Sequence, residues 1–413
     1  NYLNAVANTF DYAKQYSERV NVHKKAAGVH DTIFRIPVVV HIVYNSSQEN
    51  ISDSLVYSQI EVLNQDYRRL NSDTGDTRSI FKNVAGDVFR RFLNRIKEVQ
   101  MEKEMVFYER LASKGVSRRD FMKFCTFLTA TMGLSSSFVP KVAEVFAAPK
   151  QRPPVIWLHF GECTGCSEAL LRSMYPWIDE LVLEILSVEY HETIMAAAGH
   201  QAEENLHNAV EKYTGQFICV VEGSVATKFN GGYGKVAGKS FLQIAQEVVP
   251  KAAATVCIGS CSSFGGIPAA EPNPGGYKGV GDALGVKTLN LPGCPPNPIN
   301  LIGTIVNYLL LGKLPALDDK GRPVFAYGKT IHDTCPRRAH FENDEFVEEF
   351  GSEEAALGYC LYKMGCRGPE TYNNCAVAKF NDGTSWPVEA GHPCIGCSEP
   401  NFWDTMTPFY EEL

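Results

Sequence analysis

The chain has 413 residues, of which 45% are hydrophobic and 21% charged, and its net charge is -8 at pH 7. This composition is typical of a soluble globular protein with two or three domains. The negative charge argues against nucleic acid as the main partner. The thirteen cysteines cannot all form disulfides within one chain, because their number is odd. Six of them lie between Cys335 and Cys397 among several histidines, which favours metal ligation.

Residues 1–100 differ from the rest of the chain and contain no cysteine. The run Ile36–Tyr44 predicts a strand, and the apolar spacing over Val88–Ser113 predicts a connecting helix. Residues from about 30 to 87 resemble the N-terminal part of pappalysin-type zinc metalloproteases, with the pattern IPVVVHIVY followed by ISD. The zinc motif H-E-x-x-H is absent from the whole chain. We therefore expect residues 1–100 to be a fused or foreign leader without protease activity.

Residues 101–148 contain the three parts of an export signal in their usual order. The arginine pair Arg118-Arg119 precedes the apolar run Phe124–Leu134, and small residues follow up to Ala147 and Ala148. This order predicts a twin-arginine signal that is cleaved near the two alanines. The alternative is a chance arginine pair before a core helix. The apolar run is too short to span a bilayer. Export of a folded protein suits metal clusters that are assembled in the cytoplasm, so we expect a periplasmic location.

Residues 152–320 alternate between apolar strand-like runs and helical segments. This alternation predicts an α/β domain with a mainly parallel, doubly wound sheet. The helices include Thr193–Tyr213 and Phe241–Ala252. The expected strands, in chain order, are Val155–Leu158, Val182–Val188, Phe217–Val221, Thr255–Ile258 and Thr288–Leu291.

Four cysteines follow these strands directly. Cys163 and Cys166 form a C-x2-C pair after the first strand, and Cys261 and Cys294 follow two later ones. The pair alone fits zinc, a redox dithiol or an iron–sulfur cluster. In sheets of this class, sites form beyond the carboxyl ends of strands, so the four thiols should converge and favour an iron–sulfur cluster. Cys219 and Cys257 fall inside strands and read as buried apolar residues, while Cys125 would leave with the signal.

Residues 321–413 show little periodicity and are rich in Gly, Pro, Asn and Cys, so bound metal would supply the order that a small core cannot. The ligand-like residues of this segment are His332, Cys335, Cys360, Cys366, Cys375, Cys394 and Cys397. Structural zinc would suit the first four of them taken alone. All seven together, beside a separate four-cysteine site, fit several redox centres better.

Residues from about 117 to 413 resemble the small subunit of periplasmic [NiFe] hydrogenases. The resemblance rests on motifs spread from the signal to the end of the chain. They are ECTGC at 162–166, YHETIMAAAGH at 190–200, GSCSSFGG at 259–266, PGCPPNP at 292–298, HDTCPRRAHF at 332–341, CLYKMGCRGPETYNNC at 360–375 and WPVEAGHPCIGCSEPNFWDTMTPF at 386–409. The resemblance implies a flavodoxin-like domain over 152–320 and an irregular cluster-binding domain over 321–413.

The resemblance also implies two [4Fe-4S] clusters and one [3Fe-4S] cluster. Pro387 stands where a fourth thiolate of the three-iron cluster would be needed. The ligands would be Cys163, Cys166, Cys261 and Cys294 for the proximal [4Fe-4S] cluster, Cys375, Cys394 and Cys397 for the medial [3Fe-4S] cluster, and His332, Cys335, Cys360 and Cys366 for the distal [4Fe-4S] cluster.

The implied function is electron transfer between a nickel–iron site on a separate large subunit and an external carrier. The carrier would be a c-type cytochrome or a membrane cytochrome b. Oxygen-tolerant members of the family carry extra cysteines where this chain has Gly165 and Gly266, so we expect an oxygen-sensitive enzyme. Glu162, next to the first ligand, has either a proton-relay or a structural role. Two rival readings are an iron–sulfur subunit of a related redox complex and a secreted zinc-binding protein.

Overall fold

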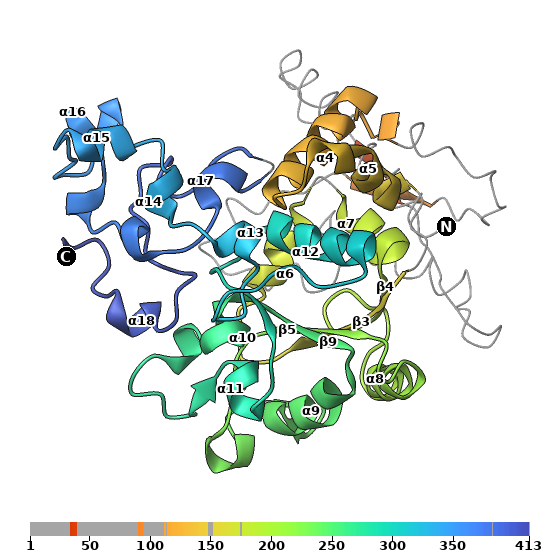
Figure 1. Ribbon diagram of the computed structural model, residues 1–413. Coiled ribbons are helices and arrows are strands. Elements are labelled where there is room, and N and C mark those ends of the chain that lie inside the picture. The colour runs from red at the N-terminus through yellow and green to blue at the C-terminus, as the bar shows by residue number, and fades with distance from the viewer. Residues whose placement is uncertain are drawn as a thin grey trace. The chain divides into compact units, whose positions relative to one another are not determined.

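The computed structural model of the protein describes residues 34–38, 90–94, 111–112, 114–147, 152–173, 176–381 and 383–412. The chain forms two compact units, Asn1–Arg118 and Arg119–Leu413. Figure 1 shows the elements of the second unit, which carries all of the predicted ligands. In the described part of the chain, no helix has both the length and the apolar character needed to cross a membrane.

In the first unit, β1 (Phe34–Val38) pairs in parallel with β2 (Arg90–Asn94). The strand predicted over Ile36–Tyr44 overlaps β1. The prediction of a helix over Val88–Ser113 is wrong for Arg90–Asn94, which form β2. The short apolar segment around Phe92 pairs with β1 instead, with Phe92 opposite Ile36. Short apolar runs fit a strand as well as a helix. The predicted leader and the protease-like segment otherwise lie almost wholly outside the described residues.

The arginine pair begins helix α4 (Arg118–Thr131), which a 3-10 turn connects to α5 (Val139–Ala147). The two helices bury apolar side chains against each other, and the rings of Phe121 and Phe146 meet edge to face at 6.2 Å. Helix α5 packs on α12 (Pro298–Leu311). The predicted signal is therefore a helical hairpin within the second unit, packed on α12.

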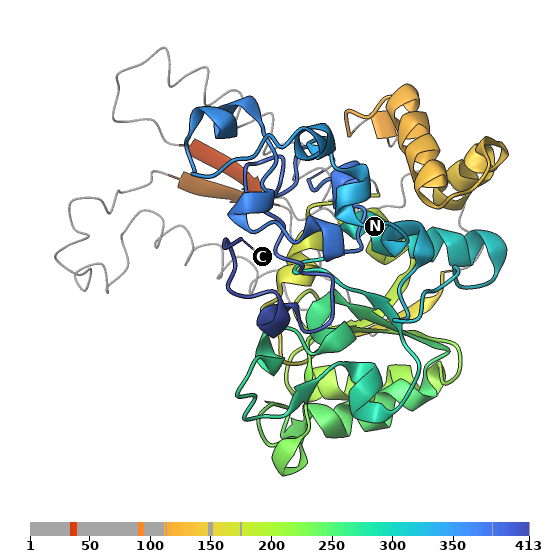
Figure 2. The ribbon, with the colours of Figure 1, turned by 60° about the vertical axis from the view of Figure 1, so that its left-hand side comes forward.

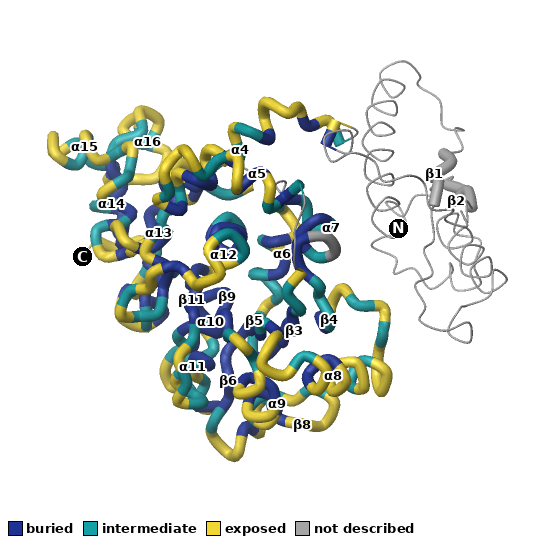
Figure 3. The backbone as a smooth tube through the Cα atoms, turned by 45° about the vertical axis from the view of Figure 1, so that its right-hand side comes forward, coloured by how far each residue is buried: buried dark blue, intermediate teal, exposed yellow. Residues whose placement is uncertain are grey.

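The centre of the second unit is a parallel sheet of five strands. Their spatial order is β11-β9-β5-β3-β4, so the first strand of the domain lies between the second and the third, as in flavodoxin-like folds. Figure 3 shows the core strands as buried. The sheet confirms the predicted fold class. The bounds are β3 (Pro154–His159), β4 (Ser187–His191), β5 (Ile218–Glu222), β9 (Ala254–Ile258) and β11 (Leu289–Leu291).

Helices cover both faces of the sheet (Figure 1). One face packs under α8 (His200–Lys212) and α9 (Phe241–Val248), with Phe217 and Val221 fully buried between the layers. The opposite face packs under three helices, of which α12 is the longest. The other two are α6 (Gly165–Leu171) and α7 (Ile178–Glu180).

The strand predicted over Val182–Val188 is displaced. Leu181–Ile185 continue α7 as a π-helical turn, and β4 begins only at Ser187. An apolar run of this length without polar alternation does not distinguish a buried helical turn from a buried strand. The strand is present, but it lies further along the chain than its most apolar residues.

The C-terminal segment beyond Gly321 contains only short helices and irregular loops, as predicted. It lies beside the carboxyl-end edge of the sheet (Figures 1 and 2). Its small core combines Ile331, Val347, Trp386 and Val388 with several cysteines. The helices are α13 (Val324–Tyr327), α14 (Ile331–Thr334), α15 (Arg338–Glu342), α16 (Glu353–Leu357), α17 (Cys375–Ala378) and α18 (Phe402–Thr405).

Candidate metal centres

The first group of thiols lies at the carboxyl ends of three parallel strands. Cys163 follows β3 and Cys166 lies in α6, while Cys261 lies in the helix α10 (Gly259–Phe264) after β9 and Cys294 follows β11. Burial raises the pKa of Cys166 well above its ordinary value, and the charges of Glu222 and of the three other thiolates raise it further. The fold thus brings the four predicted proximal residues together, and stable thiolates at this site need a cation beside them.

Glycines keep the space around these sulfurs free of side chains. A Cβ atom on Gly259 would lie 2.5 Å from the sulfur of Cys166, and one on Gly266 would lie 2.5 Å from the sulfur of Cys261. Both glycines have positive φ, +89° and +64° respectively, which L side chains rarely adopt. Four converging thiols, two of them packed against glycine backbone, fit an iron–sulfur cluster.

Glu222 is a site residue that the sequence analysis missed. It ends β5 with its side chain 1% exposed, and it accepts hydrogen bonds from the backbone N–H of Cys166 at 3.0 Å and of Ser167 at 3.1 Å. The Ser167 hydroxyl donates a further bond at 2.6 Å. Thr164, at the helix N-cap, provides no side-chain cap, so Glu222 satisfies the first N–H groups of α6 from another strand. Its only sequence signal is a carboxylate directly after an apolar strand.

We expect Glu222→Gln to destabilise the protein by about 2 kcal/mol, because an amide NH2 would face backbone donors that need an acceptor. The thermal midpoint should fall, and iron retention by the site of Cys166 should weaken. Glu204→Gln on exposed α8 is the matched control and should change neither quantity. An unchanged midpoint in Glu222→Gln would contradict the capping role.

Glu162 lies in a partly buried polar cluster beside this site. Its carboxylate lies 3.4 Å from Nδ1 of His159 and accepts a bond from the Thr164 hydroxyl at 3.2 Å. Burial and then the charge of Glu222 raise the pKa of Glu162, against the opposing effect of His159. His159 in turn contacts His191 at 3.4 Å, and burial lowers the pKa of His191 to about 3. The contacts fit both roles considered for Glu162, which stay predictions.

The second group comprises Cys375, Cys394 and Cys397. Cys375 begins α17, and the other two lie in the loop before α18. Burial raises the pKa of Cys375 well above its ordinary value, and the charges of Cys397 and Cys394 add to this effect. The structure therefore brings the three predicted medial residues together. Pro387 lies between Trp386 and Val388, which share a buried core with Cys375 and Cys394.

The third group surrounds a small cavity lined by His332, Cys335, Cys360 and Cys366, the four predicted distal residues. Burial raises the pKa of Cys360 to about 11, and the charges of Cys366 and Cys335 contribute to the increase. Burial also lowers the pKa of His332, which favours the neutral imidazole that binds metal. The ring of Phe341 packs edge-on against His332 at 4.7 Å.

The three remaining cysteines are fully buried in apolar surroundings. Cys219 and Cys257 belong to the core between the sheet and helices α8 and α9, and Cys125 is a buried residue of α4. Burial raises the pKa of Cys125 and of Cys257 to about 12. They have the surroundings of inert structural thiols.

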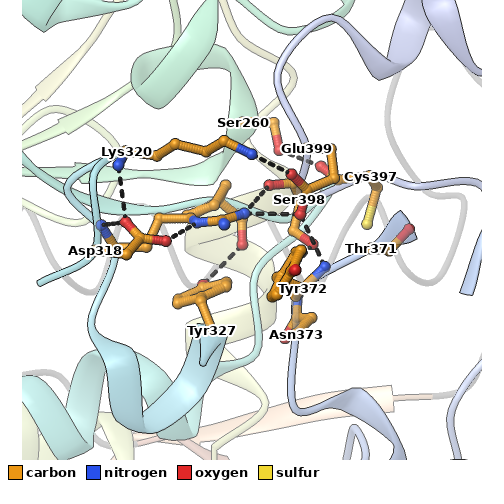
Figure 4. Close-up of polar contacts among 12 residues, drawn as sticks. Ser260, Asp318, Lys320, Tyr327, Thr371, Tyr372, Asn373, Cys397, Ser398 and Glu399 are labelled. Carbon is orange, nitrogen blue, oxygen red and sulfur yellow. Dashed lines mark hydrogen bonds and ion pairs between the residues drawn. The ribbon is translucent and has the colours of Figure 1, made fainter. Parts of the chain in front are cut away.

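A buried ion-pair network joins the sheet domain to the second group. Arg322 is 2% exposed, and its guanidinium donates to Glu399 at 2.7 Å and to Asp318 at 2.7 Å. Burial acts to lower the pKa of Arg322, but Glu399 and Asp318 outweigh it and raise that pKa. Glu399 also binds Lys320 at 2.8 Å and the backbone N–H of Tyr372 at 2.8 Å. Figure 4 shows the network beside Cys397.

Comparisons with known proteins agree with this arrangement. The family described as NADH ubiquinone oxidoreductase, 20 Kd subunit, matches residues 163–308. The family described as the C-terminal part of the NiFe/NiFeSe hydrogenase small subunit matches residues 327–410. Neither match reaches residues 30–87, so the protease resemblance stays a prediction. The second match covers the C-terminal segment that carries the medial and distal groups.

The chain is 56% identical over 306 residues to the periplasmic [NiFe] hydrogenase small subunit 1 of Nitratidesulfovibrio vulgaris, which covers 73% of this chain and 96% of that protein. It is 51% identical over 305 residues to the quinone-reactive Ni/Fe-hydrogenase small chain of Wolinella succinogenes, a match that covers 73% of this chain and 86% of that protein. The structure matches that of an H2-activated [NiFeSe]-hydrogenase of Dm. baculatum with a TM-score of 0.59 and 38% identity, covering 64% of this chain and 100% of that chain. The chain therefore belongs to the family of [NiFe] hydrogenase small subunits, which carry iron–sulfur clusters and pair with a large subunit.

Proposed function

We propose that this chain relays electrons through three iron–sulfur clusters, two [4Fe-4S] and one [3Fe-4S], between the nickel–iron site of the large subunit and an external acceptor. Bound clusters supply one-electron donors and acceptors. One observation supports the proposal most: hydrogen bonds link the loops of the three ligand groups in a row. The Ser260 hydroxyl, next to Cys261, bonds to the carbonyl of Cys397, and the N–H of Cys394 donates to the sulfur of Cys366 at 3.4 Å.

The assigned ligands follow the three groups. Cys163, Cys166, Cys261 and Cys294 would hold the proximal cluster, and Cys375, Cys394 and Cys397 the medial one. His332, Cys335, Cys360 and Cys366 would hold the distal one. Around the proximal group, Gly259 and Gly266 lie against the sulfurs of Cys166 and Cys261, where any side chain would collide with them. A neutral imidazole at the distal site makes that cluster less negative and raises its potential.

Metal analysis tests the cluster assignment. The chain, purified with its large subunit and then oxidised, should contain about eleven irons and give one three-iron signal in electron paramagnetic resonance. Removal of iron by a chelator should also lower the thermal midpoint, because the C-terminal segment has only a small apolar core. Zinc in place of iron, or the absence of a three-iron signal, would refute the assignment.

The surface beside the distal group is acidic and would bind a positively charged electron partner such as a c-type cytochrome. Phe341 packs on His332, and the following segment 342–354 carries seven acidic residues against no lysine or arginine. Opposite charge speeds the encounter of two proteins and orients them. A membrane cytochrome b with a basic docking loop would use the same surface.

Charge reversal at this surface should slow the reaction with a basic cytochrome. We expect Glu349→Lys to lower the second-order rate several-fold at low ionic strength, with the difference vanishing at high salt. Glu204→Lys on α8 changes the net charge equally and should leave the rate near that of the wild type. Equal effects of the two variants would place the docking surface elsewhere.

Export by the twin-arginine pathway is the proposed route to the periplasm, where one relative is named as residing. Arg118 and Arg119 are exposed at the start of α4, where an export receptor can read them. Helix α5 ends at Ala147, beside the predicted cleavage position.

A further inference from the structure

One serine ties together loops from two of the ligand groups. Ser260 precedes Cys261 and is 2% exposed. Its hydroxyl donates to the backbone carbonyl of Cys397 and accepts a bond from the N–H of Gly293 at 2.9 Å, while its own N–H donates to the carbonyl of Gly293 at 3.0 Å. Ser260 thus fixes the loop before Cys294 and the Cys397 loop to the same point at the end of β9. Figure 4 shows the bond from Ser260 to Cys397.

This arrangement places the backbone of a medial ligand against the residue beside a proximal ligand, because the hydroxyl of Ser260, next to Cys261, donates to the carbonyl of Cys397. On the other side, the N–H of Cys394 donates to the sulfur of Cys366 at 3.4 Å. The C-x2-C pair of the medial group therefore faces both neighbours, with Cys397 toward the proximal group and Cys394 toward the distal group. Each link joins two groups through one hydrogen bond and a few covalent bonds.

Resting on the proposed function, we infer that Ser260 is a positioning residue for electron transfer between the proximal and medial sites, because it holds the loop before Cys294 and the backbone of Cys397 to one point. Clusters held at the two sites would exchange one electron, so that the proximal one would be oxidised by one unit and the medial one reduced by one unit. No covalent bond changes in this step. The large subunit supplies the electron from hydrogen, and the external carrier removes it.

Ser260 bonds to both loops from the buried start of α10. Cys294 and Cys397 lie in irregular segments outside helices and strands. Alanine at position 260 would leave the buried N–H of Gly293 without the hydroxyl acceptor and the carbonyl of Cys397 without its donor. The two loops would then separate to admit water, and the proximal and medial groups would move apart.

The test compares Ser260→Ala with Ser262→Ala in the heterodimer. Ser262 is equally buried in the same helix, but its hydroxyl donates at 2.8 Å to the carbonyl of Ile258 within its own segment. For Ser260→Ala we expect a shifted midpoint potential of the three-iron signal, because the loop of Cys397 would move and admit water beside that site. Reduction of that signal by hydrogen, followed by rapid freezing, should be several-fold slower. Ser262→Ala should change neither.

Two further variants cover the case in which Ser260→Ala loses iron. Ser260→Thr keeps the hydroxyl and should restore the wild-type potential. Tyr327→Phe removes the bond from the Tyr327 hydroxyl to the carbonyl of Pro292 at 2.8 Å, which should shift the potential in the same direction as Ser260→Ala by loosening the same loop. Unchanged potential and rate in Ser260→Ala, or an equal shift in Ser262→Ala, would overturn the inference. A wild-type enzyme without a three-iron signal would instead refute the proposed cluster assignment.

Discussion

Arg322→Met is expected to lower the stability of the protein by roughly 3–5 kcal/mol, because it leaves the buried carboxylate of Glu399 without its main partner. The arginine also lies over the rings of Tyr327 and Tyr372 at 5.6 and 5.5 Å, so its loss removes packing as well. Glu399 is two residues from Cys397, and the variant should therefore lose iron from the medial site first. Thermal denaturation and the intensity of the three-iron signal measure the two effects.

Two companion variants distinguish the cost of leaving a buried charge unpaired from a general loss of packing. Lys320 binds the same carboxylate but is about one-third exposed, so Lys320→Met should cost less than about 1 kcal/mol. The double variant Arg322→Met/Glu399→Gln removes both charges and should be more stable than Arg322→Met alone. A double variant less stable than Arg322→Met alone would show that Arg322 and Glu399 act through hydrogen bonding alone.

Pro387→Cys is expected to convert the medial site from three irons to four. Proline has no ligand atom, whereas a thiolate at this position would complete a four-cysteine set with Cys375, Cys394 and Cys397. The three-iron signal of the oxidised protein should disappear, and the iron content should rise by about one per chain. The midpoint potential of the site should fall, because a fourth thiolate adds negative charge.

Pro387→Ser is the matched control, since serine has nearly the shape of cysteine but is a far weaker iron ligand. It should keep the three-iron signal, and any loss of stability that it shares with Pro387→Cys reports the removal of the proline ring. An unchanged three-iron signal in Pro387→Cys would contradict the medial assignment of all three cysteines.

Sequence reasoning predicted the sheet because each strand except β4 coincides with its most apolar run. It predicted the convergence of Cys163, Cys166, Cys261 and Cys294 because parallel strands end at the same edge of a sheet. The C-terminal segment was predictable only as irregular. The spacing of its ligands does not say which of them meet, and the grouping into medial and distal sets came from family resemblance.

The residues that sequence reasoning missed are those that act across long separations. Glu222 caps α6 from a neighbouring strand, 56 residues from Cys166. Arg322 meets Glu399 across 77 residues, and Ser260 meets Cys397 across 137. A lone carboxylate, arginine or serine has no local pattern that distinguishes it from a surface residue. Such roles depend on tertiary packing, which a linear pattern does not encode.

The glycines around the proximal thiols also limit where further cysteines can be introduced beside this site. A cysteine at Gly165 would place its Cβ 3.2 Å from the sulfur of Cys163, a crowding that a small shift relieves. A cysteine at Gly266 would collide with the backbone of Cys261 at 2.6 Å and would adopt a conformation that is essentially restricted to glycine. A six-cysteine site therefore requires a new main-chain path after α10, and side-chain replacement alone will not create one.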